Sequence, residues 1–104
     1  MKVRFWERVG LAGVKILIAL AETGGKDWVW ADDMFSRAGL GRGNVYKLQE
    51  LAEMGLIEVD YRRVESGRVR QFVRLTEAGL KVAQYLRSAD QAAPNVDNGA
   101  TPPL

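Results

Sequence analysis

The chain has 104 residues, of which 47% are apolar and 27% are charged, and this is the composition of one small globular domain. It contains no cysteine and no histidine, which excludes disulfides, thiolate or imidazole metal sites, and the Ser-His and Cys-His pairs of many hydrolases. The net charge is only +2, but five arginines and one glutamate lie between residues 61 and 75. We therefore predict a protein that is not an enzyme, needs no cofactor or metal, and carries its positive charge in one segment.

Residues 9–22 are predicted to form the first helix of the core. Their apolar side chains have helical spacing, with one face formed by Val9, Ala12, Gly13, Ile16, Leu17 and Leu20. The basic segment 1–8 and the apolar run after it imitate a signal peptide, but Lys15 interrupts the run, and no segment is long enough to cross a membrane. We therefore expect a cytoplasmic protein in which residues 1–8 are an N-terminal extension.

A short strand and a second helix are predicted next. The glycine pair 24–25 ends the first helix, and the aromatic and β-branched run 28–30 is expected to be a small strand covering the base of a later hairpin. Residues 31–38 follow as a helix, with Asp32 or Asp33 as its cap, since a carboxylate there can accept hydrogen bonds from free N–H groups. The same pair could bind a divalent cation, but without a third ligand we favour capping.

The third helix, predicted over residues 42–54, has two distinct faces. Its apolar stripe consists of Val45, Leu48, Leu51 and Ala52. The opposite face carries Arg42, Gly43, Tyr46, Lys47, Gln49, Glu50 and Glu53. On this face the basic residues come first and the acidic residues last, which is the reverse of the order that the helix macrodipole favours. The inversion indicates that the beginning of the helix faces an anion.

Residues 57–75 are predicted to form a β-hairpin. The register that keeps apolar residues on one face pairs Ile57, Val59 and Tyr61 with Leu75, Val73 and Gln71, and it leaves residues 65–67 as a three-residue loop. On the other face the same register pairs Glu58 with Arg74 and Arg62 with Arg70, while Arg63 and Arg68 lie near the tip. Like charges paired across strands are destabilising, and a polyanion would relieve them. A solvated basic edge that opposes aggregation is the alternative.

Residues 76–88 are predicted to form the last helix, with Thr76 as its cap. Its main apolar stripe consists of Ala78, Val82, Tyr85 and Leu86, and a second flank holds Leu80 and Ala83. One stripe can pack on the first helix, and the surplus predicts a second copy of the chain as partner. Residues 89–104 change to Ala, Asn, Asp, Gly and Pro, and are expected to be a flexible tail without chemistry of its own.

Residues 9–88 resemble winged-helix transcription regulators of the broad MarR and PadR type. The run 40–48 (LGRGNVYKL) is similar to the start of the family's recognition helix, with Gly41 where serine is common. The run 51–57 (LAEMGLI) is similar to its helix-to-strand exit, and the run 75–79 (LTEAG) to the end of its wing. The resemblance implies a mainly α fold with a small β-hairpin, in which residues 1–88 form one winged helix-turn-helix domain.

The resemblance also implies roles for individual residues. In the recognition helix Arg42, Tyr46 and Lys47 would enter the major groove, Asn44 would support the start of the helix, and Gly43 would let the backbone approach a phosphate. In the wing Arg68 and Arg70 would be the leading phosphate contacts, with Arg62 and Arg63 behind them. The expected protein is a sequence-specific regulator that binds double-stranded DNA as a homodimer.

Two other functions fit the sequence. One is a protein-docking module of a replication or transcription complex, in which Phe5, Trp6, Trp28 or Trp30 would anchor the partner. The other is a chromatin-type protein that binds duplexes through phosphates alone. Exposed tryptophans would favour the first, and binding without sequence preference would favour the second.

Overall fold

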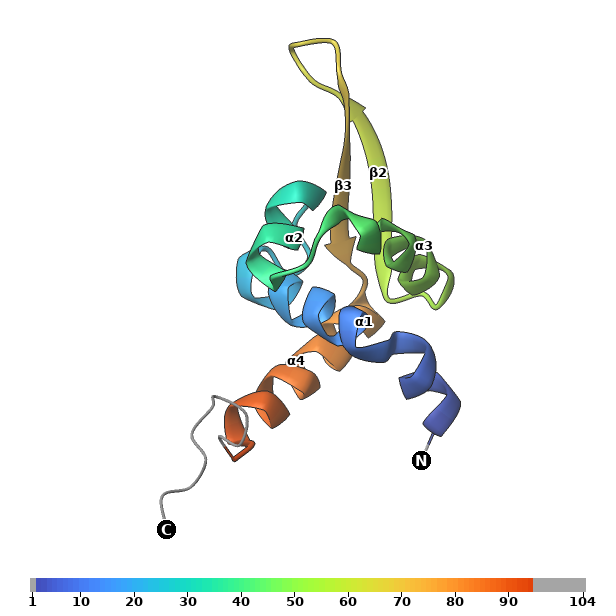
Figure 1. The fold of residues 1–104 in the computed structure, drawn as a ribbon, viewed down its shortest axis with the longest axis vertical. Coiled ribbons are helices and arrows are strands. Elements are labelled where there is room, and N and C mark those ends of the chain that lie inside the picture. The colour runs from blue at the N-terminus through green and yellow to red at the C-terminus, as the bar shows by residue number, and fades with distance from the viewer. Residues whose placement is uncertain (1, 95–104) are drawn as a thin grey trace.

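The computed structural model describes residues 2–94. Four α-helices surround one end of a small sheet of three strands, and a 3-10 helix precedes the third α-helix. In chain order the elements are α1 (Val3–Thr23), β1 (Val29–Trp30), α2 (Ala31–Ala38), η1 (Arg42–Asn44), α3 (Val45–Glu53), β2 (Ile57–Arg63), β3 (Val69–Leu75) and α4 (Glu77–Ala92). The β2–β3 hairpin projects from one end of the molecule and α4 leads away from the other (Figure 1). This is a winged helix-turn-helix, as the sequence predicts.

The core lies between α1, α2, α3 and the inner face of the sheet. The face predicted for α1 is confirmed, since Val9, Gly13, Ile16, Leu17 and Leu20 are all buried there. The same core includes Met34 and Phe35 from α2, Leu48 and Leu51 from α3, and Val73 and Leu75 from β3. Within residues 2–94, no helix is long and apolar enough to cross a membrane.

Helix α1 is longer than predicted and is broken near its start. Residues 3–9, most of which lie in the predicted N-terminal extension, form a helical segment, here called the arm. Gly10 separates the arm from the rest of α1 with φ 65° and ψ 176°, a conformation that glycine adopts without a steric penalty. The arm is basic and carries Phe5 and Trp6, whose rings meet edge to face with centroids 5.0 Å apart.

The hairpin register is confirmed at every predicted pair, including Glu58 with Arg74 and Arg62 with Arg70. The amide of Val64 donates to the carbonyl of Arg68, which closes the three-residue loop, and Gly67 takes the left-handed conformation with φ 81°. Strand β1 pairs antiparallel with β3, so the sheet order is β1-β3-β2 and the run 28–30 covers the base of the hairpin as predicted.

The expected cap of α2 is wrong. The helix begins at Ala31, directly after strand β1, so Trp30 occupies the cap position and makes no side-chain bond to the helix. Asp32 and Asp33 fall instead in the first turn, where their charges still favour the positive end of the helix dipole. The predicted bounds of this helix, 31–38, agree with the structure, and only the choice of capping residue was wrong.

Helix α4 is capped as predicted, because the Thr76 hydroxyl accepts a hydrogen bond from the Gly79 amide at 3.0 Å. The helix runs to Ala92, four residues beyond the predicted end, so the beginning of the expected tail is helical. Of that tail, residues 95–104 lie outside the described part of the chain.

The buried face of α4 also differs from the predicted stripe. Gly79 and Ala83 are buried, whereas Ala78 and Tyr85 are exposed, Tyr85 by 66%. The small residues face inward because the helix lies against backbone: a side chain at Gly79 would collide with the carbonyl of Leu56. Hydrophobic periodicity selects the large side chains, while this close approach selects the small ones.

Candidate nucleic-acid interface

The recognition segment formed by η1 and α3 exposes fewer charges than the sequence predicts. Arg42 projects furthest, with 83% of its side chain exposed, and it makes a loose ion pair with Asp32 at 3.6 Å. Tyr46 is 62% exposed and Gly43 is exposed. The Asn44 side-chain amide donates to the carbonyl of Gly41 at 3.1 Å, so it supports the start of the segment as expected.

Lys47 does not face outward, so its predicted position on the exposed face of the helix is wrong. The residue is only 8% exposed. Its ammonium group donates to the carboxylate of Glu50 at 2.6 Å and to the carbonyl oxygen of Arg8 at 3.0 Å. Lys47 therefore fastens the end of the arm to α3, and its charge is used inside the protein.

Two further ion pairs join the arm to the same side of α3. The Arg8 guanidinium lies 3.6 Å from Glu50 and 3.2 Å from Glu53. The hydrogen bond from Lys47, followed by the attraction of the two nearby cations, holds the pKa of Glu50 below its ordinary value. The acidic end of the recognition helix, which the sequence analysis placed away from DNA, is thus a docking site for the arm.

The arm also explains why the buried stripe of α3 is rotated from the predicted one. Val45 was expected in the core, yet it is 46% exposed, while Lys47 on the other flank of Leu48 is covered. Because the helical arm packs on that flank, burial extends toward Lys47 and away from Val45. The surface available for base contacts therefore contains Arg42, Val45, Tyr46 and Gln49.

At the base of the wing, three arginines lie over aromatic rings on the outer face of the sheet. The Arg70 guanidinium carbon is 4.0 Å from the centroid of Trp30, and that of Arg74 is 4.4 Å from Trp28. Arg62 lies between Trp28 at 4.9 Å and Phe72 at 5.1 Å. Each arrangement is a cation–π contact, in which the negative face of the ring attracts the cation.

These contacts change the interpretation of the paired arginines. Arg62 and Arg70 do sit opposite each other, as predicted. Asp60 accepts a hydrogen bond from Arg62 at 3.0 Å, and Trp30 lies beneath Arg70, so the protein itself relieves the repulsion. The pairing alone therefore does not require a polyanion.

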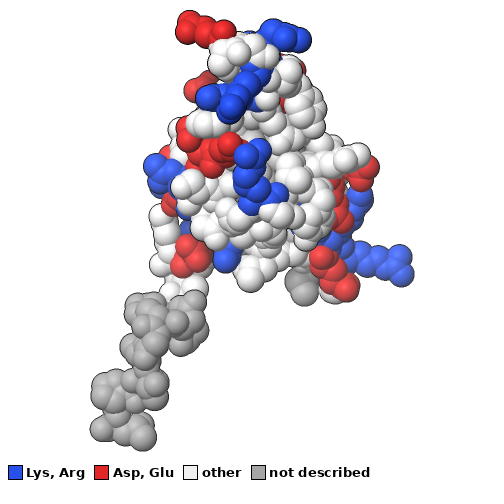
Figure 2. All heavy atoms as spheres, turned by 45° about the horizontal axis from the view of Figure 1, so that its top comes forward, with Lys and Arg blue, Asp and Glu red and all other residues white. Residues whose placement is uncertain are grey.

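The tip of the wing is different. Within residues 2–94, Arg68 makes no ion pair, and Arg63 donates only a 3.3 Å hydrogen bond to the carbonyl of Gly67. Val69 beside them is 59% exposed. Figure 2, which brings the wing end forward, shows separate basic groups on the wing with acidic side chains close to them.

A cleft of about 460 Å³ separates the wing from the beginning of the recognition segment. Three arginines, one aspartate and four uncharged residues line it: Trp30, Asp32, Arg42, Tyr61, Arg68, Val69, Arg70 and Gln71. A smaller groove of about 310 Å³ continues past Tyr61 and Gln71 to the exposed side chains of Val45, Tyr46 and Gln49. The cleft and the groove share two residues, so together they follow the space between α3 and the hairpin.

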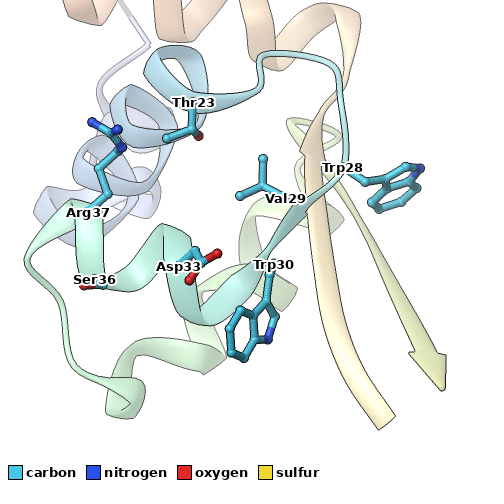
Figure 3. Close-up of a pocket in the computed structure, with 7 residues that line it drawn as sticks. All are labelled: Thr23, Trp28, Val29, Trp30, Asp33, Ser36 and Arg37. Carbon is cyan, nitrogen blue, oxygen red and sulfur yellow. The ribbon is translucent and has the colours of Figure 1, made fainter. Parts of the chain in front are cut away.

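A second hollow lies beside α2 and carries little that would select a ligand. Figure 3 shows Asp33 projecting into it, with Val29 and Thr23 behind, while the ring of Trp28 points away. It is open to solvent along its length. No group of three or more potential metal ligands occurs among the residues that the structure describes.

The contacts of Trp28 and Trp30 with arginine side chains were not predicted from the sequence. Alternation along the run 28–30 places both indoles on one face and Val29 on the other. The pairing of Val29 with Val73 then places the indoles on the face of Arg70 and Arg74. That pairing joins residues far apart in the chain. Its only signal in the sequence is a shared alternation: every second residue is aromatic in the run 28–30, and every second residue is arginine or aromatic in the run 70–74.

No known family profile matches the sequence, and no curated protein is detectably similar to it. Solved structures are similar. A PadR-like transcription factor from Bacteroides fragilis has 21% identity and a TM-score of 0.61, over 88% of this chain and 91% of that one. The smu.1704 protein from Streptococcus mutans UA159 has 19% identity and a TM-score of 0.61, over 81% of each chain. NadR, in a complex with 4-hydroxyphenylacetate, has 19% identity and a TM-score of 0.61, over 86% of this chain and 66% of that one. At these identities the likeness establishes the fold: the chain has the winged-helix architecture that is also found in a PadR-like transcription factor.

Proposed function

We propose that this protein is a sequence-specific regulator of transcription that binds double-stranded DNA, with residues 1–88 acting as one DNA-binding domain. The observation that carries the proposal is the cleft between the wing and the recognition segment, which Arg42, Arg68 and Arg70 all line. On its wing side, Arg68 and Arg70 suit the phosphates of a duplex, because a guanidinium group can form two parallel hydrogen bonds to phosphate oxygens, and Arg42 on the other side can do the same with a base edge. The winged-helix fold supports the same assignment, as does its similarity to a solved structure described as a PadR-like transcription factor.

The two elements would divide the work. The exposed side chains of η1 and α3 would enter the major groove, with Arg42 suited to guanine and Tyr46 to base or backbone contacts beside it. Gly43 would permit a DNA phosphate to approach the backbone closely. The fold itself does not require glycine there, because a Cβ would meet no other part of the protein within 4 Å. The wing arginines Arg62, Arg63, Arg68 and Arg70 would bind flanking phosphates. Lys47 has no part in this proposal.

We propose that the protein acts as a homodimer and is located with DNA in the cytoplasm. Helices α1 and α4 both leave large apolar side chains exposed, Leu11 by 72% and Tyr85 by 66%. A twofold dimer would cover such residues and would place two recognition helices on a roughly palindromic site. Analytical ultracentrifugation of the full chain checks the dimer, and a monomer at micromolar concentration would contradict it.

The docking alternative is weakened by the position of the tryptophans. Trp28 and Trp30 are half-buried, and arginine side chains lie over their rings. Phe5 and Trp6 are also half-buried and contact each other. An anchor for a protein partner would need an accessible aromatic surface.

The experiment that tests the proposal is titration of a labelled duplex of about 30 base pairs and mixed sequence at several salt concentrations. We expect binding that weakens steeply as salt rises, followed by recovery of a preferred site from a random library. Binding without any recoverable site would support the chromatin-type alternative. An absence of binding at low salt would overturn both DNA functions.

A further inference from the structure

Arg70 is held in a way that leaves its hydrogen-bond donors available. Its guanidinium carbon lies over the Trp30 ring at 4.0 Å. A guanidinium group is planar and its N–H donors lie in its plane, so stacking on a ring occupies the face and leaves the donor edge free. A lysine at the same position would have no flat face to stack and no fork of donors to present.

The free edge of Arg70 belongs to the wall of the cleft. Trp30, Arg70, Arg42 and Arg68 all line this space, and the acidic group among its walls is Asp32, which pairs loosely with Arg42. On its wing side the cleft is lined by Arg68 and Arg70 without a carboxylate from the wing, which favours an anionic group there. A phosphodiester group is such an anion.

We propose that Trp30 is a positioning residue that holds Arg70 so that Arg70 and Arg68 bind one backbone phosphate of the duplex, next to the base contact proposed for Arg42. This inference rests on the proposed function and names the principal phosphate site within it. By fixing one long side chain before binding, Trp30 removes part of the conformational entropy that binding would otherwise cost. It adds no charge of its own.

The sequence supplies a matched control in Trp28. That residue is also half-buried, directly before the same short strand, and it lies under Arg62 and Arg74, yet it does not line the cleft. Replacing either tryptophan by leucine removes one indole from the outer face of the sheet. Only Trp30→Leu should change the phosphate site.

The test measures affinity and its salt dependence for the same duplex of about 30 base pairs. Trp30→Leu should weaken binding about 2- to 10-fold, the cost of ordering one long side chain, while the salt slope stays near that of the parent. Arg70→Ala should also reduce the slope by roughly 0.9, because one phosphate contact is lost. Trp30→Phe should restore most of the affinity. Trp28→Leu should weaken binding less than Trp30→Leu, because Arg62 keeps its hydrogen bond to Asp60.

Arg70→Lys completes a double-mutant cycle. It keeps the charge but loses the stacked fork, so it should weaken binding to a similar extent as Trp30→Leu. Combining the two changes should add little to either alone, since both remove one arrangement. Thermal unfolding of each variant checks folding. If Trp30→Leu does not fold, Trp30→Phe and Arg70→Lys still test the site.

The outcomes separate this inference from the proposed function. A parent protein that does not bind duplexes would overturn both. A parent that binds, together with a folded Trp30→Leu variant of equal affinity, would overturn the positioning role alone. The positioning role would also be overturned if the losses of binding free energy from Trp30→Leu and Arg70→Lys added fully in the double variant. The two residues would then act independently.

Discussion

The wing and the recognition helix use their cations in opposite ways. In the wing, Arg62, Arg70 and Arg74 lie over aromatic rings. Arg62 and Arg74 also donate hydrogen bonds to Asp60 and Glu58, whereas Arg70 makes no side-chain hydrogen bond or ion pair within residues 2–94. In the recognition helix, Lys47 is buried and its ammonium group bonds to the protein itself. A basic residue in either element can serve the proposed DNA-binding surface only when its donors are not already bonded within the protein. We therefore expect affinity to come mainly from the wing and selectivity from the sparsely charged helix.

The largest effect on binding is expected from removing Arg68 and Arg70 together. The double variant Arg68→Ala, Arg70→Ala should weaken binding to all duplexes about equally and reduce the salt slope by roughly 2, one phosphate contact for each arginine. Fluorescence anisotropy across a salt series measures both quantities. An unchanged slope would show that the wing does not neutralise phosphates, and the contrast between the two regions would fail.

Arg42→Ala should have an effect of a different kind. Loss of a bidentate contact to guanine costs on the order of 1–3 kcal/mol, and it should appear mainly on the preferred site. A mixed-sequence duplex measured in parallel is the control, and it should lose much less. Equal losses of affinity on both duplexes would show that Arg42 contacts the DNA backbone rather than a base.

Asp32→Asn should strengthen binding by a smaller amount. The change removes the carboxylate from the wall of the cleft and releases Arg42 from its 3.6 Å ion pair. Exposed ion pairs contribute about 0.2–1 kcal/mol, so a gain of about 1.5- to 5-fold is expected. Asp33→Asn, in the same helical turn but outside the cleft, serves as the control. Weaker binding by Asp32→Asn would mean that the ion pair orders Arg42 rather than restrains it.

The smallest effect on DNA affinity is expected from Lys47→Met, which keeps the length of the side chain but removes its charge. Binding should stay within about twofold of the parent, because the ammonium group is turned inward. A large loss of DNA affinity in a variant that still folds would show that Lys47 leaves Glu50 and the Arg8 carbonyl when DNA binds. Lys81→Met, an exposed change on α4, is the control for the loss of one charge.

Lys47→Met should also change how the stability of the protein depends on pH. The hydrogen bond from Lys47 lowers the pKa of Glu50 in the folded protein. A carboxyl group whose folded pKa is lowered contributes stability above its unfolded pKa, and loses it as pH falls through the folded value. The stability difference between the parent and Lys47→Met should therefore shrink on acidification. Chemical denaturation at neutral and acidic pH measures this, and a difference that grows in acid would contradict it.

Local patterns predicted the parts of the fold that local patterns control. The hairpin register followed from alternation and from one short loop ending at Gly67, and the structure has that register. The buried face of α1 followed from helical spacing. The Thr76 cap followed from a hydroxyl placed before a helical run. In each case the residues that decide the structure are close in the chain or have one sensible pairing.

Contacts between distant segments account for what was wrong. Nothing within residues 42–54 shows that Lys47 is buried, because its acceptor is the carbonyl of Arg8 in the arm. The small residues on α4 face inward because of Leu56, which precedes a different element. For the candidate site, the positions of Arg42 and Tyr46 are as exposed as expected, while the aromatic support of the wing depends on the pairing of β1 with β3.

The break at Gly10 has a consequence for the order of folding. The arm contains seven residues, and an isolated helix shorter than about 12–15 residues is marginal in water because its first turn is costly to nucleate. Lys47 bonds to the carbonyl at its end, and Arg8 reaches Glu50 and Glu53, so the contacts that hold the arm exist only once α3 has formed. The arm is thus the last part of α1 to become helical and the first to unravel. Its amide protons should exchange with solvent well before those of residues 13–20.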